Sequence, residues 1–213
     1  MALTLTTPNT VLGALAPKSG TARLVTTFAT IVLGTLLLAA AARISVPVMP
    51  VSVSLQSLAV AMLAAAFGWR IGVATVALYI VEGLSGLPVF INGGGLHYIM
   101  SPSFGFILGW LPMAYIIGRA ADLGASGKVL PLFGAMLVAD AVSFVFGFAW
   151  LLVVANIITQ SGATLPAWLT SSPDLIATAY KGAVEPFILW DILKMAFATI
   201  TMVGAWKLLA KKG

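Results

Sequence analysis

Residues 23–56 read RLVTTFATIVLGTLLLAAAARISVPVMPVSVSLQ, and this stretch decides the class of fold. Its first part, residues 23–42, is an apolar run of the length at which an α-helix crosses a bilayer, about 20 residues. Pro47 and Pro50 follow shortly after, and proline removes helical hydrogen bonds and favours extended backbone in the residue before it. We therefore expect a membrane-spanning helix followed by an apolar but non-helical loop.

The composition of the whole chain also indicates a membrane protein. Of its 213 residues, 61% are hydrophobic and only 8% are charged, whereas soluble domains carry about a quarter charged residues. The chain has no cysteine, and His97 is its single histidine. Disulfides, metal clusters and a catalytic triad are therefore excluded, and we predict a protein that is not an enzyme and needs no cofactor or metal.

The remaining apolar segments extend this interpretation to the end of the chain. Helices are expected over residues 54–67, 71–84, 104–121, 129–158 and 186–210. Two of the connections, residues 83–103 and 159–185, are rich in Gly, Pro, Ser and Thr and should be irregular. The sequence thus predicts an all-α integral membrane protein with six transmembrane helices, formed by a single domain over residues 23–213 after a cytoplasmic tail over residues 1–22.

Basic residues are distributed unequally between the two sides of such a protein. The net charge is +5, but the basic residues are too few and too scattered to bind nucleic acid. Arg43 and Lys181 fall on one side, and the other side carries Lys18, Arg23, Arg70, Arg119, Lys128, Lys207, Lys211 and Lys212. The positive-inside rule then predicts that both termini are cytoplasmic. The irregular loops therefore fall on the outer side, where non-helical backbone at membrane depth indicates that they cover a ligand pocket. We expect a multi-pass protein of the inner membrane, in contact with lipid.

Two opposite charges lie within the last predicted helix, in the sequence WDILK. Asp191 and Lys194 are three residues apart and so share one helix face. Each charge costs roughly 2.5–3.5 kcal/mol near the centre of a bilayer. Two interpretations are open: an ion pair that only fixes the rotation of the helix, or a polar anchor for a ligand. Lys194 is the best-placed cation for an anionic ligand, because residues 71–118 contain no Lys or Arg.

Other side chains are candidates for the wall of the pocket. Asn92 precedes three glycines and can both donate and accept hydrogen bonds, which suits an amide-like or urea-like group. It is also a residue typical of turns. Trp190 can stack on a flat ligand or lie in an aromatic belt. Tyr98 is interpreted as a cavity wall or an interfacial residue.

Two further acids leave alternative functions open. Glu82 and Asp140 also lie within the predicted spans, and paired intramembrane acids can form a proton relay. A self-sufficient, proton-coupled secondary transporter is therefore the alternative function. A scaffold subunit, in which Asp191 and Lys194 only fix helix packing, is a third.

Four stretches, VPVMPVSVSLQSLAV at 46–60, GLPVF at 86–90, SPSFGFILG at 101–109 and DILK at 191–194, resemble the BioY family of biotin transporters. The resemblance implies a membrane-embedded biotin-binding subunit (S component) of an energy-coupling-factor transporter, which captures biotin from the outer side with high affinity. The implied partners are a transmembrane coupling subunit and ATPase subunits, although some members are proposed to act alone or as homo-oligomers.

The same resemblance implies which polar residues contact the ligand. Lys194 would pair with the biotin carboxylate, Asp191 would accept from the N–H groups of its cyclic urea, and Asn92 would serve the urea carbonyl. On this basis, replacing Lys194 by Ala should weaken the binding of biotin more than that of biotin amides.

Loop and docking residues are implied as well. The loop 46–56 would cover the pocket, with Val53 and Leu55 facing inward and Gln56 as a further contact. Thr35 and Ala39 on the first helix would dock the coupling subunit, with Thr35 standing where the family pattern has alanine.

Overall fold

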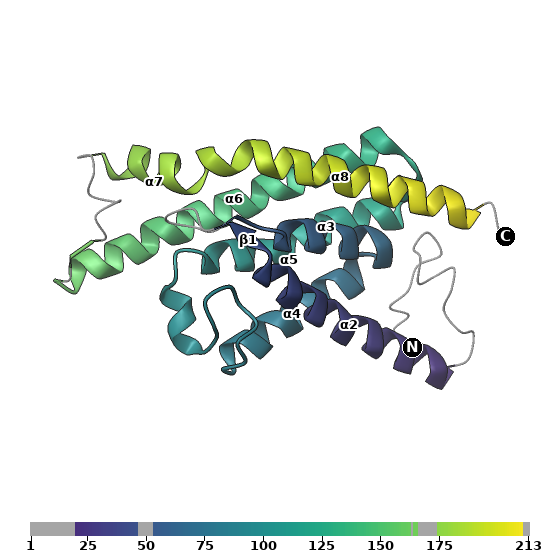
Figure 1. The fold of residues 1–213 in the computed structure, drawn as a ribbon, viewed down its shortest axis with the longest axis horizontal. Coiled ribbons are helices and arrows are strands. Elements are labelled where there is room, and N and C mark those ends of the chain that lie inside the picture. The colour runs from purple at the N-terminus through teal and green to yellow at the C-terminus, as the bar shows by residue number, and fades with distance from the viewer. Residues whose placement is uncertain (1–19, 47–52, 163, 166–173, 211–213) are drawn as a thin grey trace.

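The computed structural model describes residues 20–46, 53–162, 164–165 and 174–210. Figure 1 shows that most of these residues form helices packed side by side. The elements are α2 Gly20–Arg43, β1 Ser45–Val46, β2 Val53–Ser54, α3 Gln56–Phe67, α4 Trp69–Leu84, the 3₁₀ helix η1 Leu96–Met100, α5 Phe104–Asp122, the 3₁₀ helix η2 Ala125–Gly127, α6 Val129–Gln160, α7 Leu175–Ala183 and α8 Glu185–Ala210. The predicted helices are all present, as α2, α3, α4, α5, α6 and α8.

Within the described residues, four helical stretches are long and apolar enough to cross a membrane: Gly20–Arg43, Phe104–Asp122, Val129–Gln160 and Leu175–Leu208. The chain is therefore a mostly helical, multi-pass membrane protein, as predicted. Helices α3 and α4 have 12 and 16 residues, which is shorter than the ~20 residues of a simple span. The predicted count of six transmembrane helices consequently stays a prediction.

The proline-containing loop begins and ends as a small β-hairpin instead of staying unpaired. Ser45 pairs with Ser54, and Val46 pairs with Val53, in antiparallel register. The backbone N–H of Leu55 donates to the carbonyl of Ile44 at 3.2 Å. These bonds bring the end of α2 next to the start of α3. Residues 47–52 between the strands lie outside the described part of the chain, as does the predicted N-terminal tail up to residue 19.

The glycine-rich connection after α4 is more ordered than its composition indicates. Phe90 and Gly93 form an antiparallel bridge, which is possible because Gly93 adopts a φ of 110°, a conformation that other residues rarely adopt. The Phe90 ring is fully buried and packs edge-on against Tyr79 at 5.3 Å between centroids. Arg43, at the end of α2, donates to the carbonyl of Pro88. The hairpin and this connection are thus held together.

The polar connection 159–185, which is predicted to be irregular, contains the helix α7. The Asp174 carboxylate accepts a hydrogen bond from the backbone N–H of Ala177 at 3.0 Å, which caps the start of α7. Pro186 then lies in the first turn of α8, where its missing N–H costs nothing.

Helices α5 and α6 pack closely because glycine lies at their contact. A Cβ added at Gly109 of α5 would lie 2.8 Å from the Cα of Ser143 and 2.9 Å from its carbonyl oxygen. Only a residue without a side chain permits this approach, as is common between membrane helices. The contact holds the pocket-facing side of α6 against α5.

We expect Gly109→Ala to lower the stability of the protein by about 1–3 kcal/mol, because the added methyl group meets backbone atoms that cannot give way. Gly134 of α6 is the matched control, since a Cβ there has no neighbour within 4 Å. Gly134→Ala should leave stability unchanged or raise it by up to ~1 kcal/mol. Thermal unfolding in detergent measures both; equal melting temperatures would contradict the close contact.

The two ends of the molecule differ in the elements they carry. Helix α2 begins and α8 ends at one end, whereas η1 and α7 lie at the other (Figure 1). Ser126 of η2 donates to the carbonyl of Ala65 near the end of α3 at 3.1 Å. Gly127 lies against Trp206 near the end of α8. The short connections around η2 and between α3 and α4 therefore share the end at which α2 begins.

Candidate functional site

A cavity opens between the hairpin, the connection after α4 and the helices α3, α5, α6 and α8. It contains about 550 Å³ of space not filled by protein atoms, including the part open to the outside. Its apolar walls are aromatic and aliphatic side chains: Ile91, Phe106, Ile107, Trp110, Phe144 and Phe187. Such walls suit a ligand with a largely apolar body.

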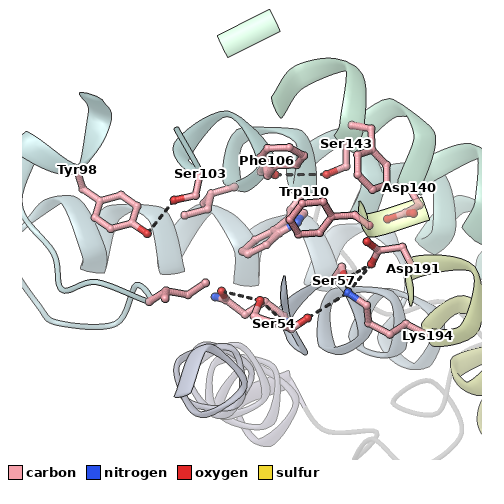
Figure 2. Close-up of a pocket in the computed structure, with 15 residues that line it drawn as sticks. Ser54, Ser57, Tyr98, Ser103, Phe106, Trp110, Asp140, Ser143, Asp191 and Lys194 are labelled. Atoms are coloured by element: carbon pink, nitrogen blue, oxygen red, sulfur yellow. Dashed lines mark hydrogen bonds and ion pairs between the residues drawn. The ribbon is translucent and has the colours of Figure 1, made fainter. Parts of the chain in front are cut away.

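Asp191 and Lys194 of α8 lie at one end of this cavity (Figure 2). Lys194 Nζ is 2.5 Å from Asp191 Oδ1, and Asp191 is only 4% exposed. The ammonium group also donates to Ser57 Oγ at 2.9 Å and to the carbonyl of Ser54 at 3.1 Å. Ser57 in turn donates to Asp191 Oδ1 at 2.9 Å. All three N–H bonds of Lys194 are thus directed at protein acceptors, and they join α8 to β2 and α3.

Asp140 of α6 lines the same end of the cavity. It is 7% exposed and interacts electrostatically with Asp191 and Lys194. From the sequence, Asp140 is a candidate for a proton relay and is not among the predicted pocket residues. A signal existed, since Asp140, Ser143 and Phe144 follow the spacing of one helix face. All three line the cavity.

Gln56 connects the cavity to the surrounding loops. Its side chain is 1% exposed and lines the cavity. Gln56 Nε2 donates to Tyr79 Oη at 2.6 Å, and Tyr79 Oη donates to the carbonyl of Val89 at 2.8 Å. Gln56 Oε1 accepts from Ser54 Oγ at 3.2 Å. This chain of bonds joins the hairpin, α4 and the glycine-rich connection beside the pocket.

Tyr98 of η1 lies at the end of the cavity away from Lys194 (Figure 2). Its hydroxyl is 3.1 Å from Ser103 Oγ, which is itself 2.9 Å from Ser101 Oγ. Burial raises the pKa of Tyr98 above its usual value, and hydrogen bonds with Ser103, Ser101 and the backbone of Asn92 act in the opposite direction. Tyr98 is therefore a neutral phenol near pH 7, able to donate and to accept hydrogen bonds.

Four of the predicted contacts lie outside the lining of this cavity: Val53, Leu55, Asn92 and Trp190. Asn92 is exposed in the turn closed by the Phe90–Gly93 bridge. Trp190 is 57% exposed, because adjacent residues of a helix point about 100° apart and Asp191 faces the cavity. Val53 packs on the apolar cluster around Leu151. Contact of these four side chains with a ligand stays a prediction.

The face predicted to dock a coupling subunit is turned into the protein. Thr35 is 1% exposed and lies 3.1 Å from Glu82 Oε1 on α4, to which its hydroxyl donates. Ala39 packs against the apolar core. Docking of a coupling subunit at Thr35 and Ala39 stays a prediction. The burial of these side chains does not favour it, because a docking residue has to be accessible to the partner. Glu82 does not line the cavity, so the two acids of the alternative proton relay do not meet there.

The chain matches a family of known proteins over nearly its whole length. The model of the BioY family covers residues 13–211. Biotin transporter BioY2 of Lactococcus lactis subsp. cremoris is 29% identical over 171 residues, which are 80% of this chain and 84% of that protein. Biotin transporter BioY of Rhizobium etli is 34% identical over 122 residues, 54% of this chain and 65% of that protein. Another alignment, with a relative from Lysinibacillus sphaericus, spans 44% of that relative's length.

A solved structure has the same fold. The crystal structure of the S-component for biotin from an ECF-type ABC transporter superposes with a TM-score of 0.70 and covers 89% of this chain and 95% of that one, at 20% identity. The relatives are named as transporters, in agreement with the prediction that the chain is not an enzyme. Since the family model spans residues 13–211 and the fold agrees, the chain belongs to the BioY family.

Proposed function

We propose that this protein is the biotin-binding membrane subunit of a biotin uptake system. The observation that carries the proposal is the cavity with apolar walls that ends at the buried pair Asp191–Lys194. The polar and apolar parts of biotin match those of the cavity: biotin has a polar cyclic urea at one end, followed by an apolar sulfur ring and an aliphatic chain. Relatives named as biotin transporters and the fold of a biotin S-component support the same ligand.

The geometry of the ion pair limits how biotin can lie in the pocket. Asp191 and Lys194 are in direct contact, so both face the same end of a bound molecule. The urea and the carboxylate of biotin are at opposite ends of an extended ligand. We therefore propose, in place of the assignment of Lys194 to the carboxylate that the family resemblance implies, that Asp191 and Lys194 both lie at the urea end of an extended biotin.

We assign the urea to the end of the cavity formed by Asp191. Asp191 Oδ1 is engaged by Lys194 and Ser57, which leaves Oδ2 to accept from a urea N–H. Lys194 acts mainly by holding Asp191 in place, because its three hydrogens already have acceptors. The carboxylate then extends toward the hydroxyl groups of Tyr98 and Ser103 at the other end.

The proposed orientation in the membrane has both termini in the cytoplasm and α3 and α4 as additional crossings. Its support is the distribution of basic residues. Arg70, Lys128 and Lys207 lie in or beside the connections that share one end of the molecule, and the positive-inside rule places that end in the cytoplasm. The cavity is lined by β2, η1 and the first halves of α3 and α8, away from that end, so it would open outward.

The proposed uptake depends on partner subunits. As the S component of an ECF-type system, the protein would pass biotin inward together with a transmembrane coupling subunit and ATPases. The fold it shares with an S-component from such a transporter supports this assembly.

Titration of the purified protein with biotin tests the proposed function. We expect saturable binding of one biotin per chain in detergent, without ATP or an ion gradient, measured by isothermal titration calorimetry. Thiamine and riboflavin serve as controls, because neither carries a cyclic urea attached to an acidic chain. Folded protein that binds none of these vitamins, or all of them equally, would exclude the proposal.

A further inference from the structure

Asp140 has the position of a ligand-binding residue. It lies on the face of α6 that also presents Ser143 and Phe144 to the cavity. Figure 2 shows it beside Asp191 at the polar end. Asp140 is 93% buried from the outside, since its exposed fraction is 7%, yet it borders the open space of the cavity.

Asp140 differs from the other buried polar groups around the cavity in lacking a hydrogen bond to the described residues. Gln56 is bonded to Tyr79, and Asp191 is bonded to Ser57 and Lys194. Buried polar side chains almost always have a hydrogen-bond partner, and an acid at membrane depth is costly without one. The partner of Asp140 is therefore to be sought inside the cavity.

A structural role as the counter-charge of Lys194 does not account for Asp140. The three hydrogens of the Lys194 ammonium group are directed at Asp191, Ser57 and the carbonyl of Ser54. One positive charge thus faces two carboxyl groups, and the closer contact belongs to Asp191. The cavity end has a surplus of hydrogen-bond acceptors, which a ligand with N–H donors satisfies.

We infer that the Asp140 carboxyl group binds the ligand by accepting a hydrogen bond from one N–H of its cyclic urea, while Asp191 accepts from the other. The inference rests on the proposed binding of biotin. The two N–H groups of a cyclic urea point away from each other, so two acceptors on different helices can each receive one. Helices α6 and α8 supply these acceptors side by side. Asp140 thereby selects ligands that carry both N–H groups.

Binding measurements with urea-modified biotins test this assignment. The ligands are biotin, desthiobiotin, which keeps the cyclic urea but lacks the sulfur ring, and two biotins methylated on one or the other urea nitrogen. We expect Asp140→Ala to weaken the binding of biotin and of desthiobiotin by similar factors of about tenfold or more, as for the loss of a hydrogen bond to a charged group. Methylation of the nitrogen that faces Asp140 should weaken binding to wild type but cost little further in the variant, because both changes remove one contact.

Asn156 supplies the matched control, because it is a polar residue of α6 that is exposed and distant from the cavity lining. Asn156→Ala should change the affinity for biotin less than about twofold, within the range of ordinary surface substitutions. Asp140→Asn keeps the size of the side chain and an acceptor oxygen, so its loss should be smaller than that of Asp140→Ala. This second variant decides the question in the same way if Asp140→Ala does not give a monodisperse, cooperatively unfolding protein.

The outcomes separate this inference from the proposed function. Wild-type protein that binds no biotin would refute the proposed function itself. Wild-type binding with unchanged affinity in Asp140→Ala would overturn only the role of Asp140. Methylation penalties that stay the same in wild type and variant, at both nitrogens, would overturn it as well, since Asp140 would then act through the fold.

Discussion

The double variant Asp191→Leu, Lys194→Met is expected to unfold at nearly the wild-type temperature, whereas either single substitution should cost about 3–5 kcal/mol of stability. Each single change leaves one buried charge without its partner, and the remaining ion must lose water without compensation. Removing both charges also removes both desolvation costs. Because Asp191 and Lys194 are in contact, their effects should be strongly non-additive.

Thermal unfolding in detergent measures the four proteins of this cycle, and a biotin titration is made on each. Stability should return in the double variant, but biotin binding should not, since the acceptor for the urea is gone. Lys181→Met, at an exposed position on α7, is the control for loss of a positive charge alone. Additive losses in stability would mean that the two side chains act independently. Recovered binding would mean that the pair only braces the helices.

Lys194→Met alone should weaken the binding of biotin and of biotin amide by the same factor, about 30-fold or more, as expected when one partner of a buried charge pair is removed. The equal loss follows from the proposed position of the carboxylate at the far end of the cavity. Lys194 would affect both ligands through Asp191, Ser57 and the backbone of Ser54.

The ratio of the two affinities is the measurement that decides, because a change in stability affects both ligands alike. A larger loss for biotin than for its amide would place the carboxylate at Lys194, as the family resemblance implied. In that case the urea would lie at the Tyr98 end. Lys181→Met again serves as the control and should change neither affinity.

The helices could be predicted because their signals are local. Pro47 and Pro50 separate the first two helices, Gly68 separates the next two, and apolar length indicates the longer spans. The contact between Asp191 and Lys194 could also be predicted, because residues three apart share a helix face. The start of α7 could be recognised only weakly, from the capping residue Asp174.

The composition of the pocket could not be predicted in this way. Ser57 contacts Asp191 across 134 positions of sequence, and no local pattern indicates this pair. Trp190 and Asn92 are close in sequence to pocket residues but are exposed, since neighbours along a chain point in different directions. The sequence shows Asp140 as an acid within a predicted span, but it does not show which side chains lie next to Asp140 across the cavity.

The amino-acid sequence by itself determined that the chain enters a membrane, the approximate limits of α2, α3, α4, α5, α6 and α8, and that one opposite-charge pair lies on the last helix. Hydropathy, proline positions and helical periodicity depend only on residues close together in the sequence, so the helices they indicate can be predicted without coordinates. Only the tertiary structure decided which side chains share the cavity, because that depends on how α3, α5, α6 and α8 approach one another. Close packing at Gly109 and the bonds from Lys194 to Ser54 and Ser57 set that approach, and with it the end of the pocket at which Asp140 and Asp191 meet.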